Sequence, residues 1–379
     1  MDKIYLAKVN NYYADNLSIE IENIFNNFEI LSSLNSNSKI LLKPNLIAKY
    51  SPDAGVTTHP LFVKSIIKEL QKRNVTNIIL ADSCGGPAGN SVMKSVYRAS
   101  GMEKLCKEEN ILLYNESLST MVKYSNGKLV KEFELINIVN EVDLIINLPK
   151  LKTHVMTGVT CATKNVFGLI PGLTKAELHF RFPNKNDFGD MLIDLNLTLG
   201  KMMHIVDGIT SMQGDGPTGG TVYNSNVILA SDNQYLLDTV VCKMFDFSLL
   251  DVPYLNAAKN RNLTNLTYTK ENILNGYELI TPFDNFEKPK SYKDVDFSGH
   301  IGFLSPFIKK FLSPRPIIDK SLCIGCKKCF EICPQHVIDI LKGKAHINKK
   351  NCIKCFCCHE VCPANAIDIK SSNFFNLKI

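Results

Sequence analysis

CIGCKKCFEICP (323–334) and CIKCFCCHEVCP (352–363) are two copies of one cysteine motif near the end of a 379-residue chain. Both copies follow a C-x2-C-x2-C-x3-C-P spacing, and each cysteine of the second copy lies 29 residues after its counterpart in the first. The similarity continues into CPQHVIDI (333–340) and CPANAIDI (362–369). This repetition predicts a duplicated unit in which each half is a cysteine loop, a short helix and a short strand.

The spacing suits thiolates that hold a [4Fe–4S] cube. Three cysteines of one loop can bind three iron atoms, while the fourth cysteine, just before the proline, reaches the cluster of the other half. We therefore expect two [4Fe–4S] clusters. The first would be held by Cys323, Cys326, Cys329 and Cys362, and the second by Cys352, Cys355, Cys358 and Cys333.

Other uses of these cysteines are disfavoured. Zinc sites use paired C-x2-C units or cysteine with histidine, and disulfides do not suit a reducing compartment. Cys357 falls outside the spacing and is expected to be a bystander thiol. The segment resembles the bacterial-type two-cluster ferredoxin domain over about fifty residues, which implies electron transfer.

Composition and charge narrow the class of protein. The N-terminal MDKIYLAKVN lacks the features of a secretory signal, and no apolar run approaches the ~18 residues of a membrane span, so we expect a cytoplasmic protein. The formal net charge is +6. Each oxidised cluster with its four thiolates would add about −2 to this net charge. The smaller positive charge of the cluster-loaded protein disfavours nucleic acid as a partner.

Residues 1–285 alternate short apolar runs with amphipathic stretches. Strands are expected at 4–9, 39–43, 77–82, 111–114, 143–148, 204–209 and 226–231. Helices are expected at 17–31, 60–70, 90–108, 187–203, 233–245 and 253–261, with a hairpin turned at Asn126-Gly127. This alternation predicts a mostly parallel α/β sheet with flanking helices, to which the small α+β cluster domain is added.

Such sheets bind ligands outside the carboxyl ends of their strands. Polar loops are expected there at 43–45, 82–87, 149–154 and 207–217. Lys150, Lys152 and Lys164 could hold an anionic ligand, or could be solvated surface charges. The Gly85-Gly86 loop matches no phosphate-binding motif and is expected to be a tight turn.

The acidic, histidine and cysteine residues of these loops leave alternatives open. Asp82 and Asp207 could be acid/base groups, metal ligands, or caps of helices and turns. His59 and His154 could be proton donors, although lone histidines are more often structural. Cys84 and Cys161 could be reactive, although an inert buried thiol is the more common case.

The strings KPNL (43–46), THP (58–60), NLPKLKTH (147–154), TKNVFGLIPG (163–172) and DGITSMQGDGP (207–217) resemble the family known as domain of unknown function 362. That family often carries a two-cluster ferredoxin segment at its C-terminus. The resemblance spans about 35–285 and implies an iron–sulfur protein whose reaction is undefined. Its motif positions fall on Lys43, Asn45, His59, Asp82, Lys150, Lys152, His154, Lys164, Asn165, Asp207, Gln213 and Gly214.

The chain is expected to divide into an α/β domain (1–285), a linker (286–316) and the cluster domain (317–371). The stretch 301–312 is apolar with two lysines and could form an amphipathic face. This stretch could be a strap that holds the cluster domain against the α/β domain, or it could contact a membrane surface. We favour the strap, because Pro306 interrupts the helix that a membrane contact would need.

Taken together, these features favour a ferredoxin-fused oxidoreductase. It would pass low-potential electrons from a redox partner protein to an anionic small molecule or cofactor in the α/β cleft, with His154 or His59 supplying the proton. One alternative is an electron carrier that serves a separate enzyme. Another is a non-redox ligase, racemase or maturation factor with structural clusters. No flavin or nicotinamide motif is visible, and a flavin stays an open question.

Overall fold

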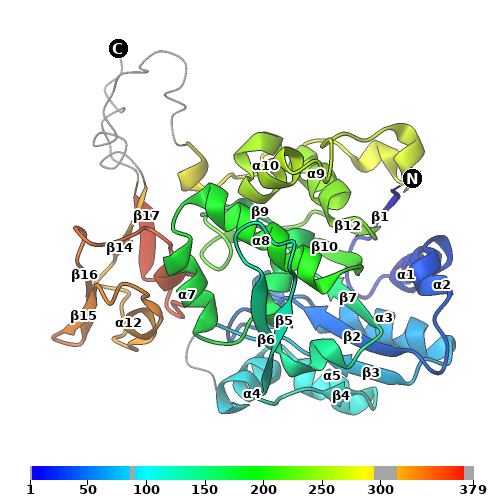
Figure 1. The fold of residues 1–379 in the computed structure, drawn as a ribbon, viewed down its shortest axis with the longest axis horizontal. Coiled ribbons are helices and arrows are strands. Elements are labelled where there is room, and N and C mark those ends of the chain that lie inside the picture. Colours follow the sequence, from blue (N-terminus) through cyan, green and yellow to red (C-terminus); the bar gives the residue numbers. More distant parts are fainter. Residues whose placement is uncertain (1, 86–89, 294–313, 371–379) are drawn as a thin grey trace.

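The computed structural model describes residues 2–85, 90–293 and 314–370 (Figure 1). The proposed strap at 301–312 and part of the loop at 82–87 lie outside the described residues. Within the described ranges, no helix is both long and apolar enough to cross a lipid bilayer. An α/β body and a separate cysteine-rich domain are both present. Because much of the linker at 286–316 lies outside the described residues, the division into three segments stays a prediction.

The body is built on an eleven-stranded, mostly parallel sheet, which confirms the expected fold class. Five adjacent strands, β10, β7, β2, β3 and β4, run parallel to one another, whereas β12 pairs antiparallel with both β1 and β10. The order across the sheet is β13 (Ile273–Asn275), β1 (Ile4–Lys8), β12 (Val227–Ser231), β10 (Met203–Gln213), β7 (Leu144–Leu148), β2 (Lys39–Pro44), β3 (Asn77–Leu80) and β4 (Leu112–Leu113).

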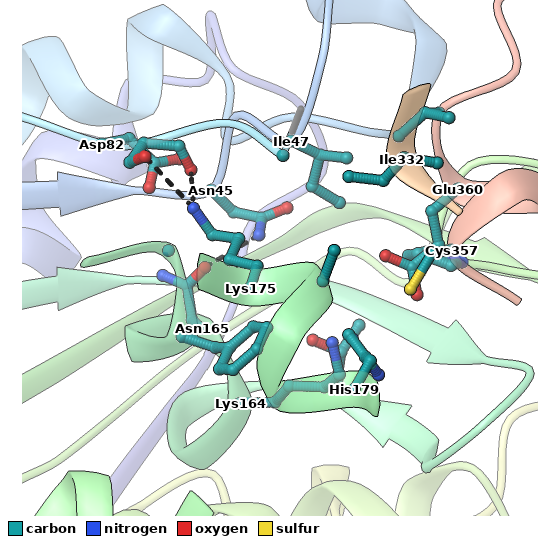
Figure 2. A pocket seen from close by; sticks show the side chains of 18 of the residues that line it. Asn45, Ile47, Asp82, Lys164, Asn165, Lys175, His179, Ile332, Cys357 and Glu360 are labelled. Atoms are coloured by element: carbon teal, nitrogen blue, oxygen red, sulfur yellow. Dashed lines mark hydrogen bonds between the residues drawn. The ribbon is translucent and has the colours of Figure 1, made fainter. Parts of the chain in front are cut away.

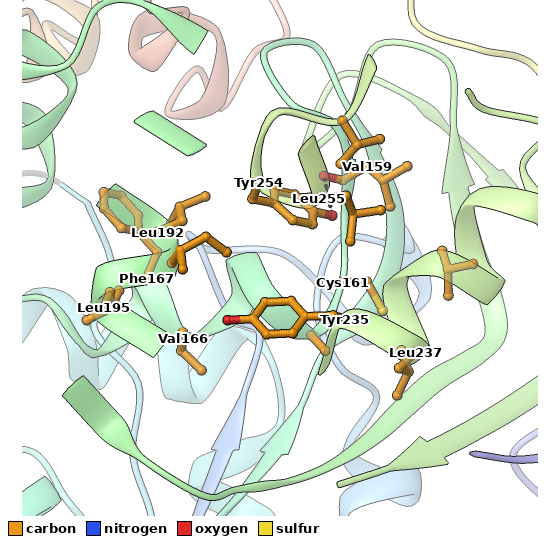
Figure 3. Close-up of a cluster of buried hydrophobic side chains, with 14 of the residues drawn as sticks. Val159, Cys161, Val166, Phe167, Leu192, Leu195, Tyr235, Leu237, Tyr254 and Leu255 are labelled. Carbon is orange, nitrogen blue, oxygen red and sulfur yellow. Dashed lines mark hydrogen bonds between the residues drawn. The ribbon is translucent and has the colours of Figure 1, made fainter. Parts of the chain in front are cut away.

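Helices bury both faces of this sheet, which explains why its strands are continuously apolar. On β2, Ile40 and Leu42 face one side while Leu41 faces the other. The first side packs against α1 (Asn16–Asn27), α2 (Glu29–Ser32), α3 (Pro60–Lys72), α4 (Asn90–Ala99) and α5 (Met102–Glu108). The second packs against α6 (Ala162–Asn165), α8 (Lys185–Leu199), α9 (Gln234–Met244) and α10 (Pro253–Asn260), where Tyr235 and Tyr254 lie among aliphatic side chains (Figure 3).

Two helices expected to be continuous are each divided in two. The helix expected at 90–108 breaks at Gly101, which adopts φ +79°. A side chain there would be strained and would press on Pro60, whose ring lies 3.2 Å from the position of the missing Cβ. The helix expected at 17–31 breaks at Phe28, whose backbone is extended.

The stretch 149–154 was expected to be a loop, and that expectation is wrong. Lys150–His154 forms strand β8, which pairs parallel with β10 and antiparallel with β9 (Gly158–Thr160). Strand β10 also continues to Gln213 and pairs with β11 (Thr221–Tyr223). Lysines in an alternating polar stretch indicate exposure, but here both lysine side chains are fully buried because the interior supplies them with acceptors.

The hairpin at Asn126-Gly127 is confirmed. Strands β5 (Ser119–Lys123) and β6 (Glu132–Ile136) pair antiparallel on either side of that turn. It lies outside the main sheet and packs its apolar face on α8 through residues such as Phe133 and Leu135. The Asp194 carboxylate of α8 accepts three backbone N–H groups of the segment 128–130 and so fixes the hairpin to the body.

The cysteine-rich domain has the duplicated architecture that its sequence predicts. Strands β14 (Arg315–Ile318) and β17 (Ile367–Lys370) pair antiparallel, as do β15 (Ile338–Leu341) and β16 (Lys344–Ile347). Helices α12 (Lys328–Ile332) and α13 (Cys357–Glu360) follow the two loops. Positive φ values recur at matching positions of the repeat, at Gly325 and Lys354, at Lys327 and Phe356, and at His336 and Asn365.

Hydrogen bonds hold this domain against the loop that follows β10. His359 Nε2 lies 3.0 Å from the carbonyl oxygen of Asp215, and the Thr218 hydroxyl lies 3.2 Å from the carbonyl oxygen of Glu360. Lys290 pairs with Asp215 at 3.1 Å and with Asp368 at 2.7 Å. Helix α13 therefore faces the α/β body.

Candidate functional site

The two loops fit the clusters expected of them. Cys323, Cys326, Cys329 and Cys362 line a single cavity of about 350 Å³ within the cysteine-rich domain. These are the four residues that the sequence assigns to one cluster, three from the first repeat and one from the second. Backbone N–H groups of Ala345 and Ala366 lie 3.5 and 3.3 Å from the sulfurs of Cys323 and Cys362, as is common for cluster thiolates.

The second set is grouped in the same way. The Cys352 sulfur interacts electrostatically with Cys355 and with Cys333 of the other repeat, and burial together with these neighbours raises the pKa of the Cys352 thiol. Cys358 is buried and interacts electrostatically with Cys352, Cys355 and Cys333, and also with Cys329 of the first set. Within the described part of the chain, no three His, Cys, Asp or Glu side chains converge on one metal ion, whereas the thiolates of a cube bind four different iron atoms.

A cavity lies between the α/β body and the cysteine-rich domain (Figure 2). It measures about 710 Å³, counted out to its open mouth. In Figure 2, Ile332, Cys357 and Glu360 of the cysteine-rich domain form one wall, opposite Asn45 and Asp82 of the body. The remaining polar lining is Lys43, Ser83, Thr160, Lys164, Asn165, Lys175 and His179.

Lys43 and Asp82 form a buried ion pair in the wall of this cavity. They occupy the ends of neighbouring strands β2 and β3, and Lys43 Nζ lies 2.7 Å from Asp82 Oδ1. The other oxygen of Asp82 accepts the N–H of Leu46 at 2.8 Å. A Cβ on Gly168 would lie 2.3 Å from Asp82 Oδ1, so only glycine leaves room for the pair. Asp82 is thus a partner of Lys43, and neither charge is free.

A chain of buried amides continues from this pair. Asn165 accepts from Asn45 Nδ2 at 2.8 Å and donates to Asn147 Oδ1 at 2.7 Å. Asn45 Oδ1 accepts from Lys152 Nζ at 2.6 Å, and Lys152 also donates to the carbonyl oxygen of Val56. Burial, together with the charges of Lys164 and Lys150, lowers the pKa of Lys152 well below its ordinary value. Lys152 lies behind the cavity wall and orients Asn45.

Lys164 differs from the other lysines of the site. Its side chain lines the cavity, the residue is 8% exposed, and its ammonium has no hydrogen-bond or ion-pair partner among the described residues. Its ammonium lies 5.7 Å from the ring centroid of Phe167 and interacts electrostatically with the Glu360 carboxylate. A buried ammonium without a hydrogen-bond partner is costly, so this position is suited to an anion that enters the cavity.

Three titratable residues of the cavity, Lys175, His179 and Glu360, were not predicted from the sequence. Lys175 and His179 lie on α7 (Thr174–Arg181), and Glu360 belongs to the cysteine-rich domain. Lys175 Nζ donates to the Ser83 carbonyl oxygen at 2.8 Å and also to the Ile170 carbonyl, so it fastens α7 to the loop after β3. The only sequence signal for these residues was their closeness to recognised motifs.

His154 lies beneath the cavity and contacts Glu360. Its Nδ1 accepts the N–H of Met156 at 3.0 Å, and Nε2 lies 3.2 Å from Glu360 Oε1, although the two are not aligned as a regular hydrogen bond. Burial and the charge of Lys164 lower the pKa of His154 to about 3, so the ring is neutral with its proton on Nε2. Burial raises the pKa of Glu360, but His154 and Lys164 outweigh it and keep Glu360 ionised.

Three expected site residues, Lys150, Asp207 and His59, belong to another cluster. Lys150 Nζ donates to Asp207 Oδ2 at 3.0 Å, to Tyr12 Oη at 2.6 Å and to Thr210 Oγ1 at 2.9 Å, which uses all three of its protons. Asp207 also accepts the backbone N–H of His59, whose ring stacks on Tyr12. These residues do not line the cavity. They secure β10 to the start of α3.

The remaining candidates have structural surroundings. Gln213 and Gly214 bond to the backbone of Glu287. Cys161 is fully buried next to Asp238, and burial raises the pKa of both Cys84 and Cys161. Cys357 is also buried, but it lines the cavity beside the cluster-domain residues Ile332 and Val361.

The fold and the site together define an α/β protein with an appended iron–sulfur domain. Residues 40–243 match the family described as "Domain of unknown function (DUF362)", and residues 315–363 match the "4Fe-4S dicluster domain". Since the first match covers more than half of the chain, this protein belongs to the DUF362 family. Its dicluster domain implies [4Fe–4S] clusters and iron–sulfur electron transfer.

Two known proteins are similar to parts of the chain. The "Thylakoid-associated protein sll1697" of Synechocystis sp. is 27% identical over 270 residues, which are 68% of this chain and 78% of that protein. The lactate racemase apoprotein from Thermoanaerobacterium thermosaccharolyticum has a TM-score of 0.34 and 16% sequence identity. That match covers 54% of this chain and spans half (50%) of the racemase, and so distant a likeness does not bear on activity.

Proposed function

We propose that this protein is an iron–sulfur oxidoreductase whose cavity holds an anionic small molecule or cofactor. The observation that carries the proposal is Lys164, a buried ammonium that faces the cavity and makes no hydrogen bond or ion pair with any described residue. A ligand carboxylate or phosphate would satisfy that charge. The clusters supply one-electron chemistry when bound.

The position of the cavity supports the redox part of the proposal. Its wall includes Cys357 and Glu360 of α13, the helix that also carries the expected cluster ligand Cys358. A ligand at Lys164 would therefore lie beside the expected binding loop of the second cluster. Reduction of that ligand would oxidise the clusters by the same number of electrons.

The proton that accompanies reduction needs a source that faces the ligand. His154 and His59 do not line the cavity, whereas Lys164 and His179 do. Burial lowers the pKa of His179 to about 4, so its ring is neutral at neutral pH. Lys175 also lines the cavity, but its ammonium donates to the carbonyl oxygens of Ser83 and Ile170. We therefore infer that Lys164, whose pKa burial also lowers, is the proton donor.

The test compares the anaerobic holoprotein with its Lys164→Gln variant. Native mass spectrometry would detect a co-purifying anion, and thermal-shift titration with pyrophosphate and short dicarboxylates would measure affinity in both proteins. We expect Lys164→Gln to purify without the anion. Its affinity for the added anions should fall about tenfold or more, since a charge-assisted hydrogen bond contributes roughly 1.5–3 kcal/mol. Lys104→Gln, which removes a lysine that is 82% exposed, is the matched control.

Redox activity is tested separately, by mixing the chemically reduced holoprotein with the identified ligand. Reoxidation of the clusters in wild type, and its loss in Lys164→Gln with the cluster absorbance unchanged, would support the oxidoreductase. A ligand that binds equally to both proteins would contradict the role of Lys164. Activity that persists with the clusters held in one oxidation state would favour a non-redox enzyme instead.

A further inference from the structure

The two cysteine repeats have the same backbone path but different surroundings. Phe356, Cys357 and His359 of the second repeat are buried, because the α/β body covers them. Their counterparts in the first repeat are Lys327, Lys328 and Phe330, and Phe330 is 43% exposed. The loop of the second repeat thus packs against the α/β body, while the equivalent surface of the first repeat is not covered by any part of the chain that the structure describes.

The open surface exposes apolar side chains around a cluster ligand. Leu322, Ile324 and Leu341 are 53, 67 and 55% exposed, and Cys326 is the one exposed cysteine among those described. The turn after Leu341 adjoins the loop, since a Cβ on Gly325 would lie 2.3 Å from the carbonyl oxygen of Gly343. Exposed apolar side chains grouped in this way are typical of protein interaction sites.

The charges of this surface are mostly positive, although the exposed Asp319 and Glu331 flank it. The segments 320–328 and 341–344 contain five lysines and no aspartate or glutamate. These lysines are Lys320, Lys327, Lys328, Lys342 and Lys344. A basic rim around an apolar centre complements an acidic protein surface and speeds its diffusional encounter.

We propose that this surface, comprising residues 320–328 and 341–344, is the docking site of an acidic one-electron carrier protein. The carrier loses one electron, and the cluster held by Cys323, Cys326, Cys329 and Cys362 gains it. The direction of flow rests on the proposed function, in which electrons leave at the cavity. The same charges would suit an anionic membrane, but a membrane offers no electron to the exposed ligand Cys326.

The experiment uses the full holoprotein and a small acidic two-cluster ferredoxin as the probe. Stopped-flow absorbance follows reduction of the holoprotein by the pre-reduced probe, and calorimetry measures binding of the oxidised probe. The test variant is Lys327→Glu/Lys342→Glu. The matched control is Lys349→Glu/Lys350→Glu, which makes the same charge change at two exposed lysines ahead of the second loop. Ile324→Gln tests the apolar centre without changing charge.

We expect the test variant to lower the second-order rate constant at low salt about tenfold or more, and the wild-type rate to fall as ionic strength rises. Ile324→Gln should weaken binding severalfold, and the control should retain at least about half of the wild-type rate. Photoreduction by deazaflavin, with EPR of the product, checks that all variants keep both clusters.

Several results would overturn the proposal. These are equal slowing in the test and control variants, a rate insensitive to salt, equally fast reduction by a basic carrier protein, or tighter binding to anionic phosphatidylglycerol vesicles than to the probe. These measurements do not involve the cavity ligand. Failure of the oxidoreductase proposal would therefore leave the docking result intact, and the reverse also holds.

Discussion

His154 Nε2 lies 3.2 Å from Glu360 Oε1, and this contact joins the centre of the α/β body to the cluster domain. The histidine is fully buried on β8, and the carboxylate projects from α13 into the cavity. Because His154 is neutral, the contact is that of an N–H beside a carboxylate, whose charge remains available to Lys164. The cavity therefore has a wall that depends on both domains.

Replacing Glu360 by alanine should weaken the attachment of the cluster domain. The change leaves His154 Nε2 without its partner, which costs ~1–3 kcal/mol. In wild type, loss of cluster absorbance and loss of helical circular dichroism should coincide on heating, whereas in Glu360→Ala the clusters should bleach first. Glu331→Ala is the control, since Glu331 holds the equivalent repeat position and is exposed. Coincident transitions in both variants would contradict this prediction.

The exchange of cysteines between repeats can be tested by substitution. Cys326→Ser and Cys362→Ser should remove the same EPR signal and leave about four irons per chain, although these residues lie in different repeats. Cys333→Ser and Cys355→Ser should remove the other signal. Cys357→Ser should keep about eight irons. If Cys362→Ser and Cys358→Ser remove the same signal, each repeat instead binds its own cluster.

The Lys150–Asp207 pair should matter for stability and not for the ligand. Asp207→Ala leaves a fully buried ammonium without its carboxylate, and the free energy of unfolding should fall by ~3–5 kcal/mol. The double variant Lys150→Met/Asp207→Leu should cost less, because no charge remains buried. Denaturant titration measures both. A stable Asp207→Ala protein that no longer binds the cavity ligand would place Asp207 in the site after all.

Stability should decline as the pH falls below about 6.5. Burial lowers the pKa of His204 to about 3 and that of His179 to about 4. In the unfolded chain these histidines are protonated near pH 6.5, whereas in the native protein they are protonated only at much lower pH. Between its native pKa and about pH 6.5, each such histidine changes the free energy of unfolding by ~1.4 kcal/mol per pH unit. Above about pH 6.5 this destabilising effect of protonation is absent.

Denaturant titrations at pH 7.5, 6.5 and 5.5 would check this. His204→Gln should reduce the slope by ~1.4 kcal/mol per pH unit, the contribution of one histidine. Equal slopes in wild type and His204→Gln would show that His204 can be protonated in the folded protein.

Local patterns in the sequence determined much of this protein. The spacing of eight cysteines fixes the duplicated loops, because a cluster ligand must reach its iron from a short stretch of backbone. Continuous apolar runs such as those of β2 and β7 predict a sheet buried on both faces. The sequence also predicts that Lys43, Asn45 and Asp82 lie at the carboxyl ends of neighbouring strands, and all three line the cavity there.

Only the tertiary structure decided which charged residues share the cavity. Lys150 and Lys164 look alike in sequence. In the structure Lys150 donates to Tyr12, Asp207 and Thr210, whereas Lys164 makes no hydrogen bond or ion pair with a described residue. Glu360 comes from the cluster domain, far along the chain. Periodicity and spacing report local burial and backbone geometry, whereas the partner of a buried charge depends on which distant segments pack beside it.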